Sequence, residues 1–540
     1  MHHAITTLDW IVIGTYLVFL IAFALWLARG QSNREDYYVA GREMGAWPIA
    51  ISVMATQCST NSILGAPAFV AFAAGGGLVW LQYELALPFA MVVLMFIFMP
   101  TFNRLQLISV YSYLERRFDS KTRRLVAGLF LFVRAFATAV TVYSIAIVTD
   151  LISGIGFFWS VVLLGVFTVI YDAIGGIKGV VYSDVLQMCI LVSVLALLLF
   201  MLVEGAGGFR AMLEALEPER RRTIDFSHHG FGDGNTFAFW PMLIGGFFLY
   251  ISYYGCDQSQ VQRELCAKNI QETNKALFIN GLLRFPLVAL YCLVGVGIAV
   301  YATGSPDFIS KLPQTDGSPN YNLAVPLYIL TQLPAGLIGL ALVALFAAAM
   351  SSLDSVLNSL SATTMEDFVR PFVGEGWLSD HELATSRLIT LCWGALTLSM
   401  AFFVGDIAPT VLEAINKIGS LANGPILAVF TLGLLVPRST GTSVCLGLLA
   451  GILVNVCLWL FAPQVSWLWW NVTGFLVTGL VSTASVTLLN GRVTEFSPKE
   501  HLIPYRGQKD GETTGATAYS LLLTLWGALL LCVLLWLQGG

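Results

Sequence analysis

The sequence predicts an all-helical membrane protein with many spans, and three observations carry that prediction. Hydrophobic residues make up 57% of the 540 residues and charged residues only 11%, whereas soluble domains hold about 45–50% and about 25%. The apolar residues form long unbroken runs, which a barrel strand alternating over about 10 residues would not produce. The net charge of −5 gives no basic field for nucleic acid. A cytosolic enzyme, a nucleic-acid-binding protein and a disordered chain are therefore excluded.

A hydropathy window of about 19 residues predicts about fourteen spans along the chain. The first, from Leu8 to Leu27, is too long for a signal-peptide core and is read as a retained span. Lys and Arg concentrate in alternate loops, including 29–42, 104–124, 263–275 and 492–509. Because cytoplasmic loops carry an excess of these residues, we expect both termini to lie outside a cell membrane. The predicted spans start near Leu8, Ala46, Leu78, Leu125, Phe157, Val180, Phe237, Ala276, Ala335, Arg387, Ala408, Thr442, Val465 and Ala518.

Two of the predicted spans contain interruptions. The second holds the polar stretch ATQCSTNS at 55–62 and then Gly65 and Pro67, and the seventh holds paired glycines followed by YISYYGCDQ at 250–258. Interrupted helices at corresponding positions are a good sequence pointer to the binding site of a secondary transporter. Their spacing predicts an inverted five-helix repeat, because an odd-numbered repeat must insert with opposite orientation. The expected organisation is one transporter domain with an extra helix at 8–30, repeats at 46–204 and 237–437, and further helices at 442–540.

The predicted ninth span carries oxygen atoms on one face. Ser351, Asp354 and Ser355 lie at positions i, i+3 and i+4, which share a helix face. Hydroxyl, carbonyl and carboxylate oxygens are the ligands that a hard cation such as Na⁺ prefers. The alternative is that the hydroxyls bond to the preceding turn or ease helix packing.

Five motifs in order resemble the sodium:solute symporter family, whose members include sodium/glucose, sodium/proline, sialic-acid, iodide and multivitamin carriers. The resemblance runs from about residue 8 to 460 and is specific for the family more than for the solute. The motifs are DYYVAGREMGAW at 36–47, YSYLERRF at 111–118, GGIKGVVYSD at 175–184, DQSQVQR at 257–263, and Gly424-Pro425 with Gly433.

The resemblance implies a LeuT-type fold and sodium-driven alternating access. It implies a sodium site made by the carbonyl groups of Ala55, Cys58 and Ala348 and the hydroxyl groups of Ser351 and Ser352. It also implies a possible second sodium site at Asp184, Ser351, Asp354 and Ser355. Asp354 stands where the sialic-acid carriers have serine, so it could bind a second Na⁺ or carry a proton, because burial favours a neutral carboxyl unless a cation lies beside it.

The predicted solute contacts are Gln57, Ser59, Ser62, Gln82, Arg134 and Tyr253. Tyr253 matches the tyrosine that closes the inner exit of the sugar carriers, although it could simply pack the bundle. A guanidinium pairs well with a carboxylate, so Arg134 either binds an anionic solute or pairs with Glu84. The predicted function is sodium-coupled import of a small organic solute, with a carboxylate as the leading candidate. The alternatives are a proton-coupled symporter using Asp354 and a sodium-driven sugar or amino-acid carrier.

Two other classes of protein are less favoured. A membrane sensor would need a kinase domain after the spans, and the sequence leaves little length for one. An intramembrane enzyme would need a nucleophile with a base, or a metal cluster, at depth. The motifs H-E-x-x-H and G-x-S-x-G are both absent from the sequence, so we expect no enzymatic activity.

Overall fold

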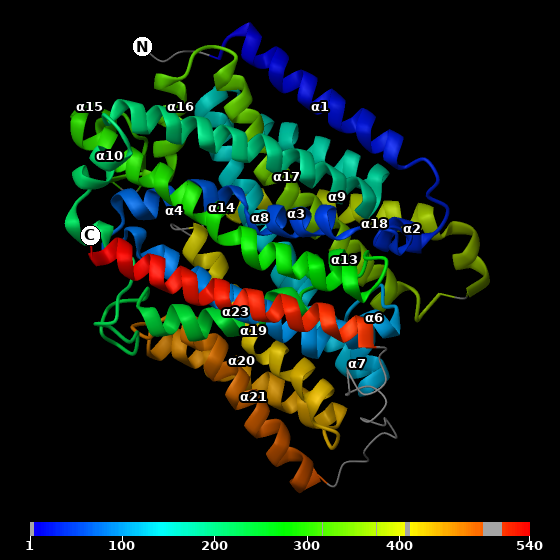
Figure 1. Cartoon of the computed structure of the whole chain (residues 1–540). Coiled ribbons are helices and arrows are strands. Elements are labelled where there is room, and N and C mark those ends of the chain that lie inside the picture. The colour runs from blue at the N-terminus through cyan, green and yellow to red at the C-terminus, as the bar shows by residue number, and fades with distance from the viewer. Residues whose placement is uncertain (1–4, 316, 374, 405–410, 490–509, 540) are drawn as a thin grey trace.

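The computed structural model describes residues 5–539 except 316, 374, 405–410 and 490–509 (Figure 1). Within these residues the regular secondary structure is helical apart from two isolated β-bridges and one small hairpin, in which β1 (Gln314–Thr315) pairs antiparallel with β2 (Ser318–Pro319). Ten stretches of the described residues are long and apolar enough to cross a bilayer. The prediction of an all-helical protein with many spans is therefore confirmed. The ten are Thr7–Leu27, Leu78–Leu105, Ser120–Leu151, Phe157–Gly205, Ile270–Gly304, Leu337–Val369, His381–Val404, Lys417–Leu435, Gly441–Phe461 and Gly515–Gln538.

The predicted count of fourteen spans is not confirmed, and the difference has a physical origin. The 49-residue helix α9 (Phe157–Gly205) contains two predicted spans, joined at Gly176, where φ is 54° and ψ is −163°. A Cβ atom at Gly176 would lie 2.7 Å from the carbonyl oxygen of Tyr37, so the bend requires glycine. The spans predicted near Ala46 and Phe237 are divided into shorter helices. The span predicted near Val465 corresponds to α21 (Trp467–Leu489).

The first interruption divides α3 (Ala46–Gln57) from α4 (Thr60–Phe72). Cys58, the residue after α3, has φ −84° and ψ 65°, and Ser59 is extended. The polar stretch of the sequence therefore coincides with a break in the helix. Backbone groups freed by such a break must find partners within the protein or in a cavity.

The second interruption lies at Asp257. It follows η4 (Pro241–Gly245) and α12 (Gly246–Cys256), and it precedes the short helix α13 (Gln258–Glu264). Asp257 is extended, with φ −92° and ψ 121°, and its side chain accepts a hydrogen bond from the backbone N–H of Ser259. An aspartate at this position caps the helix that follows.

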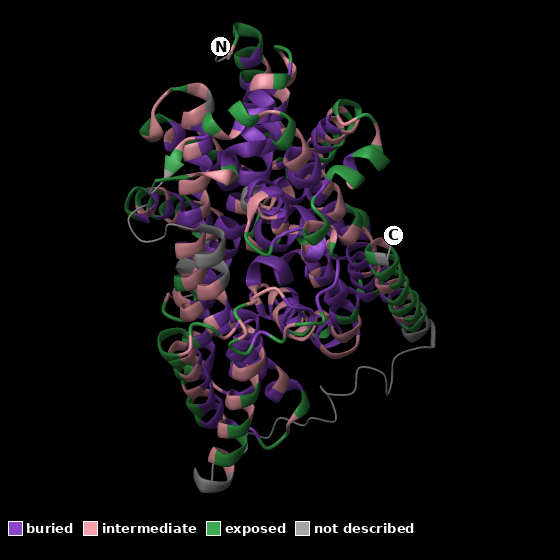
Figure 2. Cartoon of the chain, turned by 90° about the vertical axis from the view of Figure 1, so that its left-hand side faces the viewer, coloured by how far each residue is buried: buried purple, intermediate pink, exposed green. Residues whose placement is uncertain are grey.

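The centre of the bundle is α17 (Leu337–Thr363), nearly all of whose residues are buried. It packs against α1 (Thr7–Leu27), α3, α8 (Ser120–Ser153) and α9. Buried residues run through the middle of the molecule, and most exposed residues lie on outer helices and loops (Figure 2). The remaining elements are α2 (Arg34–Val39), η1 (Ala40–Arg42), η2 (Leu78–Leu85), α5 (Ala86–Val93), η3 (Leu94–Phe98), α6 (Met99–Leu105), α7 (Ser112–Arg117), α10 (Phe209–Ala215), α11 (Pro218–Arg221), α14 (Ile270–Gly304), α15 (Pro306–Ser310), η5 (Tyr321–Leu323), α16 (Ala324–Gln332), η6 (Thr364–Val369), α18 (Glu375–Val404), α19 (Val411–Leu435), α20 (Gly441–Phe461) and α23 (Asp510–Gly539).

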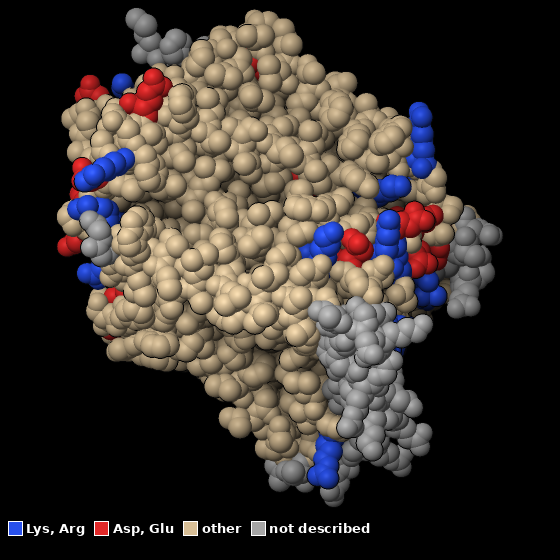
Figure 3. Space-filling view, in the orientation of Figure 1, with Lys and Arg blue, Asp and Glu red and all other residues tan. Residues whose placement is uncertain are grey.

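Charged side chains gather at two opposite edges of the visible face, with a broad uncharged belt between them (Figure 3). The helices α2, α6 and α7 lie at one of these edges, and α10, α15 and both chain ends lie at the other (Figure 1). A belt without charge flanked by two charged rims is the pattern expected of a chain that crosses a bilayer. The rims therefore define the two membrane surfaces, and we call the one with α2, α6 and α7 the α2 rim.

Candidate functional site

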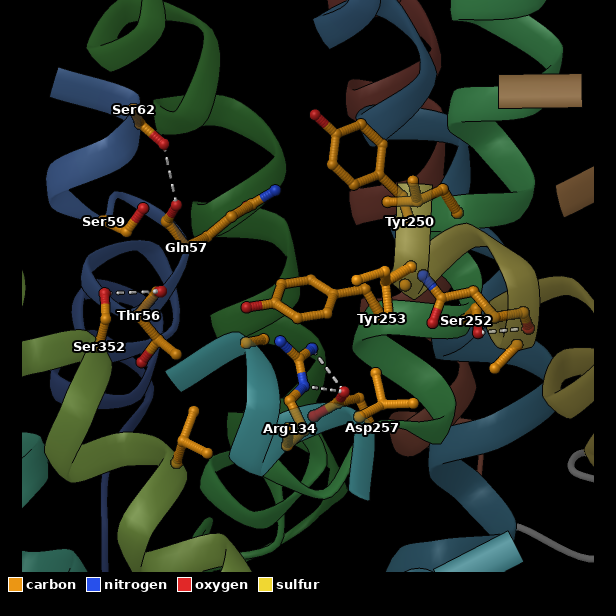
Figure 4. A pocket seen from close by; sticks show the side chains of 18 of the residues that line it. Thr56, Gln57, Ser59, Ser62, Arg134, Tyr250, Ser252, Tyr253, Asp257 and Ser352 are labelled. Atoms are coloured by element: carbon orange, nitrogen blue, oxygen red, sulfur yellow. Dashed lines mark hydrogen bonds and ion pairs between the residues drawn. The ribbon is translucent and has the colours of Figure 1, made fainter. Parts of the chain in front are cut away.

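A cavity of about 250 Å³ lies between the two interrupted helices. Its walls come from the α3–α4 break, from η2, α8, α12, α14 and α19, and from one turn of α17. Figure 4 shows that side chains from these separate elements converge on the same space. The breaks predicted from the sequence are therefore the parts of the backbone that border the cavity.

The end of α3 and the middle of α17 face each other closely. The Ser351 hydroxyl donates to the carbonyl oxygen of Ala55 at 3.4 Å and to that of Ala348 at 3.1 Å. The Ser352 hydroxyl lies 3.4 Å from the carbonyl oxygen of Thr56 and 3.2 Å from that of Ala348 (Figure 4). Both hydroxyls thus bond to the preceding turn of their own helix, as the alternative interpretation predicts, and both also contact carbonyl oxygens of α3.

This arrangement suits an alkali cation. The five predicted ligands Ala55, Cys58, Ala348, Ser351 and Ser352 belong to the two facing segments, and Cys58 is fully buried at the break. Each supplies a carbonyl or hydroxyl oxygen, which are the atoms that Na⁺ prefers over nitrogen or sulfur. Since hydroxyl protons can rotate away, the same oxygens that now share hydrogen bonds could instead coordinate an ion.

The residues of the possible second sodium site lie in a deeper polar group. Asp184 on α9 accepts a hydrogen bond from Ser52 at 2.5 Å. Asp354 accepts one from the Tyr171 hydroxyl and one from the Ser355 hydroxyl, the latter at 3.2 Å. All four residues of this predicted site, which are Asp184, Ser351, Asp354 and Ser355, are buried.

Arg263 on α13 joins this polar group, and no sequence pattern predicted which residues it contacts. Its guanidinium donates to Ser52 at 2.7 Å, lies 3.5 Å from Asp184 and also bonds to Ser355. Asp172, which is fully buried, receives a hydrogen bond from Asn358 at 3.4 Å. Three buried carboxyl groups, of Asp172, Asp184 and Asp354, thus share this polar group with one buried guanidinium. Uncompensated charges are costly in a membrane interior, so ionised carboxyl groups beyond the one that Arg263 balances would need a cation, and neutral ones would need protons.

Arg134 lies in the cavity wall but does not pair with Glu84, so that interpretation is wrong. Its Nε and Nη2 atoms lie 2.6 and 2.5 Å from Oδ2 of Asp257. The Tyr253 ring stacks on the guanidinium with its centroid 4.9 Å away (Figure 4). The reason is geometric, because Arg134 on α8 is level with the α12–α13 break, whereas Glu84 on η2 is held by another helix.

The partner of Glu84 is Arg284 on α14. The Arg284 Nε atom lies 3.7 Å from the carboxylate, and Glu84 also accepts a hydrogen bond from Tyr250 at 3.0 Å. Arg284 is only 4% exposed, so its guanidinium lies in the interior of the protein. Both residues line the cavity, and Nε and Nη1 of Arg284 have no hydrogen-bond partner within the part of the chain that the structure describes. The signal for this pair was the presence of opposite charges within two apolar spans.

Four other predicted solute contacts, Gln57, Ser59, Ser62 and Tyr253, line the cavity. Gln82 does not, because it is fully buried and its amide is fully used. The amide nitrogen donates to the Phe237 carbonyl oxygen at 2.8 Å and contacts the Met242 sulfur at 3.2 Å, and the amide oxygen accepts the Asp225 N–H at 3.1 Å. Gln82 therefore ties the 222–237 loop to η2, which argues against a solute contact.

Two interrupted helices, a central cavity with charged walls and a buried set of oxygen atoms define a secondary transporter. Comparison with known proteins agrees with this class. Residues 37–451 match the model of the sodium:solute symporter family. The sodium/sialic acid symporter NanT of Aliivibrio fischeri is 30% identical over 88% of this chain and 92% of its own length. The human sodium-coupled monocarboxylate transporter 1 is 30% identical over 83% of this chain and 72% of its own.

Solved structures agree on the fold. A sodium-coupled sialic acid symporter, described as substrate-bound and outward-open, superposes with a TM-score of 0.80 at 23% identity, covering 89% of this chain and 98% of that one. The nucleobase-cation-symport-1 transporter Mhp1 superposes with a TM-score of 0.57 at 14% identity, covering 87% and 98%.

The chain belongs to the sodium:solute symporter family. It is a sodium-coupled solute symporter in a membrane, and both the predicted family and the predicted coupling ion are confirmed. The relatives named above are transporters, not enzymes.

Proposed function

We propose that the chain imports a small organic carboxylate together with Na⁺. The observation that carries the proposal is the position of Arg134, whose guanidinium lies in the cavity wall with two nitrogen atoms engaged by Asp257 and Nη1 without a protein partner among the described residues. A guanidinium can hold two carboxylates through different edges. The names of two relatives, a sialic acid and a monocarboxylate transporter, support a carboxylate.

We propose that Na⁺ binds between α3 and α17, to the oxygens of Ala55, Cys58, Ala348, Ser351 and Ser352. A second cation would bind at Asp184, Ser351, Asp354 and Ser355. The excess of buried carboxyl groups over guanidinium groups there supports this assignment. Asp354 takes either Na⁺ or a proton in this scheme. The test measures the number of charges transported per solute molecule in proteoliposomes that contain the wild type or Asp354→Asn. A lower number in the variant means that one cation is no longer transported, and an equal number means that the stoichiometry does not depend on Asp354.

We also propose fourteen spans and external termini. In this topology α3 with α4 crosses once, η4 with α12 and α13 crosses once, α9 crosses twice, and α21 crosses once. The repeats span 46–204 and 237–437. Support comes from the α2 rim, which carries Arg34, Arg42 and Arg116 among other basic residues and lies opposite both chain ends. Cytoplasmic surfaces carry such an excess of Lys and Arg.

The deciding experiment crosses ions with solutes. Purified protein is heated with sodium, lithium or potassium chloride, each combined with a panel of carboxylates, sugars and amino acids. Bound ligands raise the unfolding temperature by mass action. We expect carboxylates to stabilise the protein only with sodium, and the same compounds to enter proteoliposomes down a sodium gradient. Stabilisation by sugars or amino acids alone, with no carboxylate response, would refute the proposed solute class.

A further inference from the structure

The short helix α13 separates the cavity from the α2 rim. All seven of its residues, Gln258–Glu264, are buried. Gln258 donates to the carbonyl oxygen of Ile108 at 2.7 Å and accepts the Val110 N–H at 2.8 Å. Gln262 donates to the carbonyl oxygen of Tyr38 on α2 at 2.8 Å. Because these contacts fill the space behind the α12–α13 break, a path from the cavity to this rim requires α13 to move.

One ion pair holds each end of α13. At its start, Oδ2 of Asp257 bonds to Arg134 in the cavity wall, while Oδ1 caps α13. At its other end, Arg263 lies 3.5 Å from Asp184 and bonds to Ser355. Asp257 and Arg263 are six positions apart, so about 9 Å along the helix axis separates the two anchors.

Each anchor uses groups that a transported ion also needs. A carboxylate solute would bind the Arg134 guanidinium directly beside Asp257, and a cation at the proposed second site would use the oxygens of Asp184 and Ser355, which Arg263 now contacts. A solute anion beside Asp257 repels that carboxylate, and a cation beside Arg263 repels that guanidinium. Each ion therefore weakens one anchor and leaves the other intact.

We propose that α13 couples the two transported species, because each releases one of its two anchors and only both together free the helix. The solute half of this inference rests on the proposed carboxylate, and the sodium half rests on the proposed cation site at Asp184 and Ser355. The device makes binding of each species favour the same opened state, which is the physical condition for coupling between two sites. It also prevents either ion from opening the path alone.

The test follows exposure of α13 directly. Val261, in the middle of α13, is fully buried, and Val261→Cys places a thiol there. The rate at which N-ethylmaleimide labels this thiol, resolved by mass spectrometry of the full-length protein in nanodiscs, reports release of α13. The protein is kept in sodium chloride or in an equal concentration of choline chloride, with no solute. In the otherwise unchanged protein we expect nearly equal rates in both salts.

Asp257→Asn removes the solute-side anchor while keeping a residue that caps helices well. Sodium alone should then raise the labelling rate about fivefold or more, the lower end of ordinary coupling between sites. Arg134→Gln breaks the same ion pair from the other side and should act alike if Asp257→Asn does not fold. The matched control is Asp225→Asn, which removes a buried carboxylate from the 222–236 loop, where it bonds to His228, and should behave as the parent does.

Two results overturn the inference. One is an equal labelling rate in sodium and choline for both Asp257→Asn and Arg134→Gln, and the other is a sodium response of Asp225→Asn as large as theirs. A separate experiment adds sialic acid or lactate to the Val261→Cys protein in sodium chloride. We expect at least one of them to raise the labelling rate of the thiol about fivefold. If neither carboxylate acts while Asp257→Asn responds to sodium, the proposed solute is wrong and the role of α13 stands.

Discussion

The ion pair between Glu84 and Arg284 allows a sharp prediction about stability. Their closest charged atoms are 3.7 Å apart, and the side chains are 2% and 5% exposed. At an effective dielectric constant of about 20, two unit charges at this distance attract by about 4–5 kcal/mol. Removing one partner of a buried pair leaves the other unpaired and costs about 3–5 kcal/mol, whereas replacing both is often close to neutral. Arg284→Met should therefore destabilise the protein by about 4 kcal/mol, and adding Glu84→Gln should restore most of that loss.

The assay is equilibrium unfolding in mixed micelles with a rising fraction of sodium dodecyl sulfate, for the wild type, both single variants and the double variant. The matched control is the solvent-exposed pair of Arg210 and Glu214, where Arg210→Met should leave the unfolding midpoint unchanged because water screens such pairs. If Arg284→Met alone is as stable as the wild type, or if the double variant is as unstable as Arg284→Met, the two charges do not depend on each other and the reasoning fails.

Three further predictions concern the sodium site, the attachment of the 222–236 loop by Gln82, and the pH dependence of that loop. Ser352→Ala should raise the sodium concentration for half-maximal uptake about tenfold, while Ser193→Ala, at an exposed serine of α9, should not, and equal values for both would contradict the site. Gln82→Leu should destabilise the protein by about 1–3 kcal/mol, because it leaves buried partners unbonded, without changing the affinity for solute in binding assays. Burial raises the pKa of Asp225, but hydrogen bonds from His228 and Ser227 outweigh it and lower that pKa overall. Protection of the 222–236 loop in hydrogen exchange should thus be complete above about pH 4 and be lost as the pH falls further, and Asp225→Asn should remove this dependence.

The sequence predicted those features that depend on local composition. The apolar runs gave the helical class, and the polar stretch at 55–62 gave the first helix break, because a broken helix in a membrane needs polar or small residues nearby. The spacing of Ser351, Asp354 and Ser355 placed them on one face of α17, where the structure has them beside α3 and α9. These inferences needed no knowledge of how the helices pack.

The number of spans needed more than local composition. In α9 the two predicted spans follow each other directly, with the non-helical residue Gly176 at the bend between them, so they form one 49-residue element. A hydropathy window detects apolar length, so it separates the two apolar runs but does not show that a single residue with positive φ joins them. The spans predicted near Ala46 and Phe237 differ from the structure in the opposite way. Each is one predicted span that the structure divides into helices too short to cross a membrane alone.

The choice of charge partners was beyond the sequence for a different reason. Insertion energetics require a buried charge to have a partner, and this argument correctly placed Glu84 and Arg134 inside the protein. The argument does not give the depth of a charged residue in the membrane or the direction in which its side chain points. Because successive residues of a helix are rotated by about 100°, a carboxylate on any of several neighbouring helices would meet the requirement equally well. In the structure Arg134 forms an ion pair with Asp257, at the break between α12 and α13, and Arg263 forms one with Asp184. Both partnerships meet at α13. A pair formed at a helix break can be lost without unfolding a helix, so charges placed there can change partners during a transport cycle, whereas the pair of Glu84 and Arg284 joins two elements that have no such freedom.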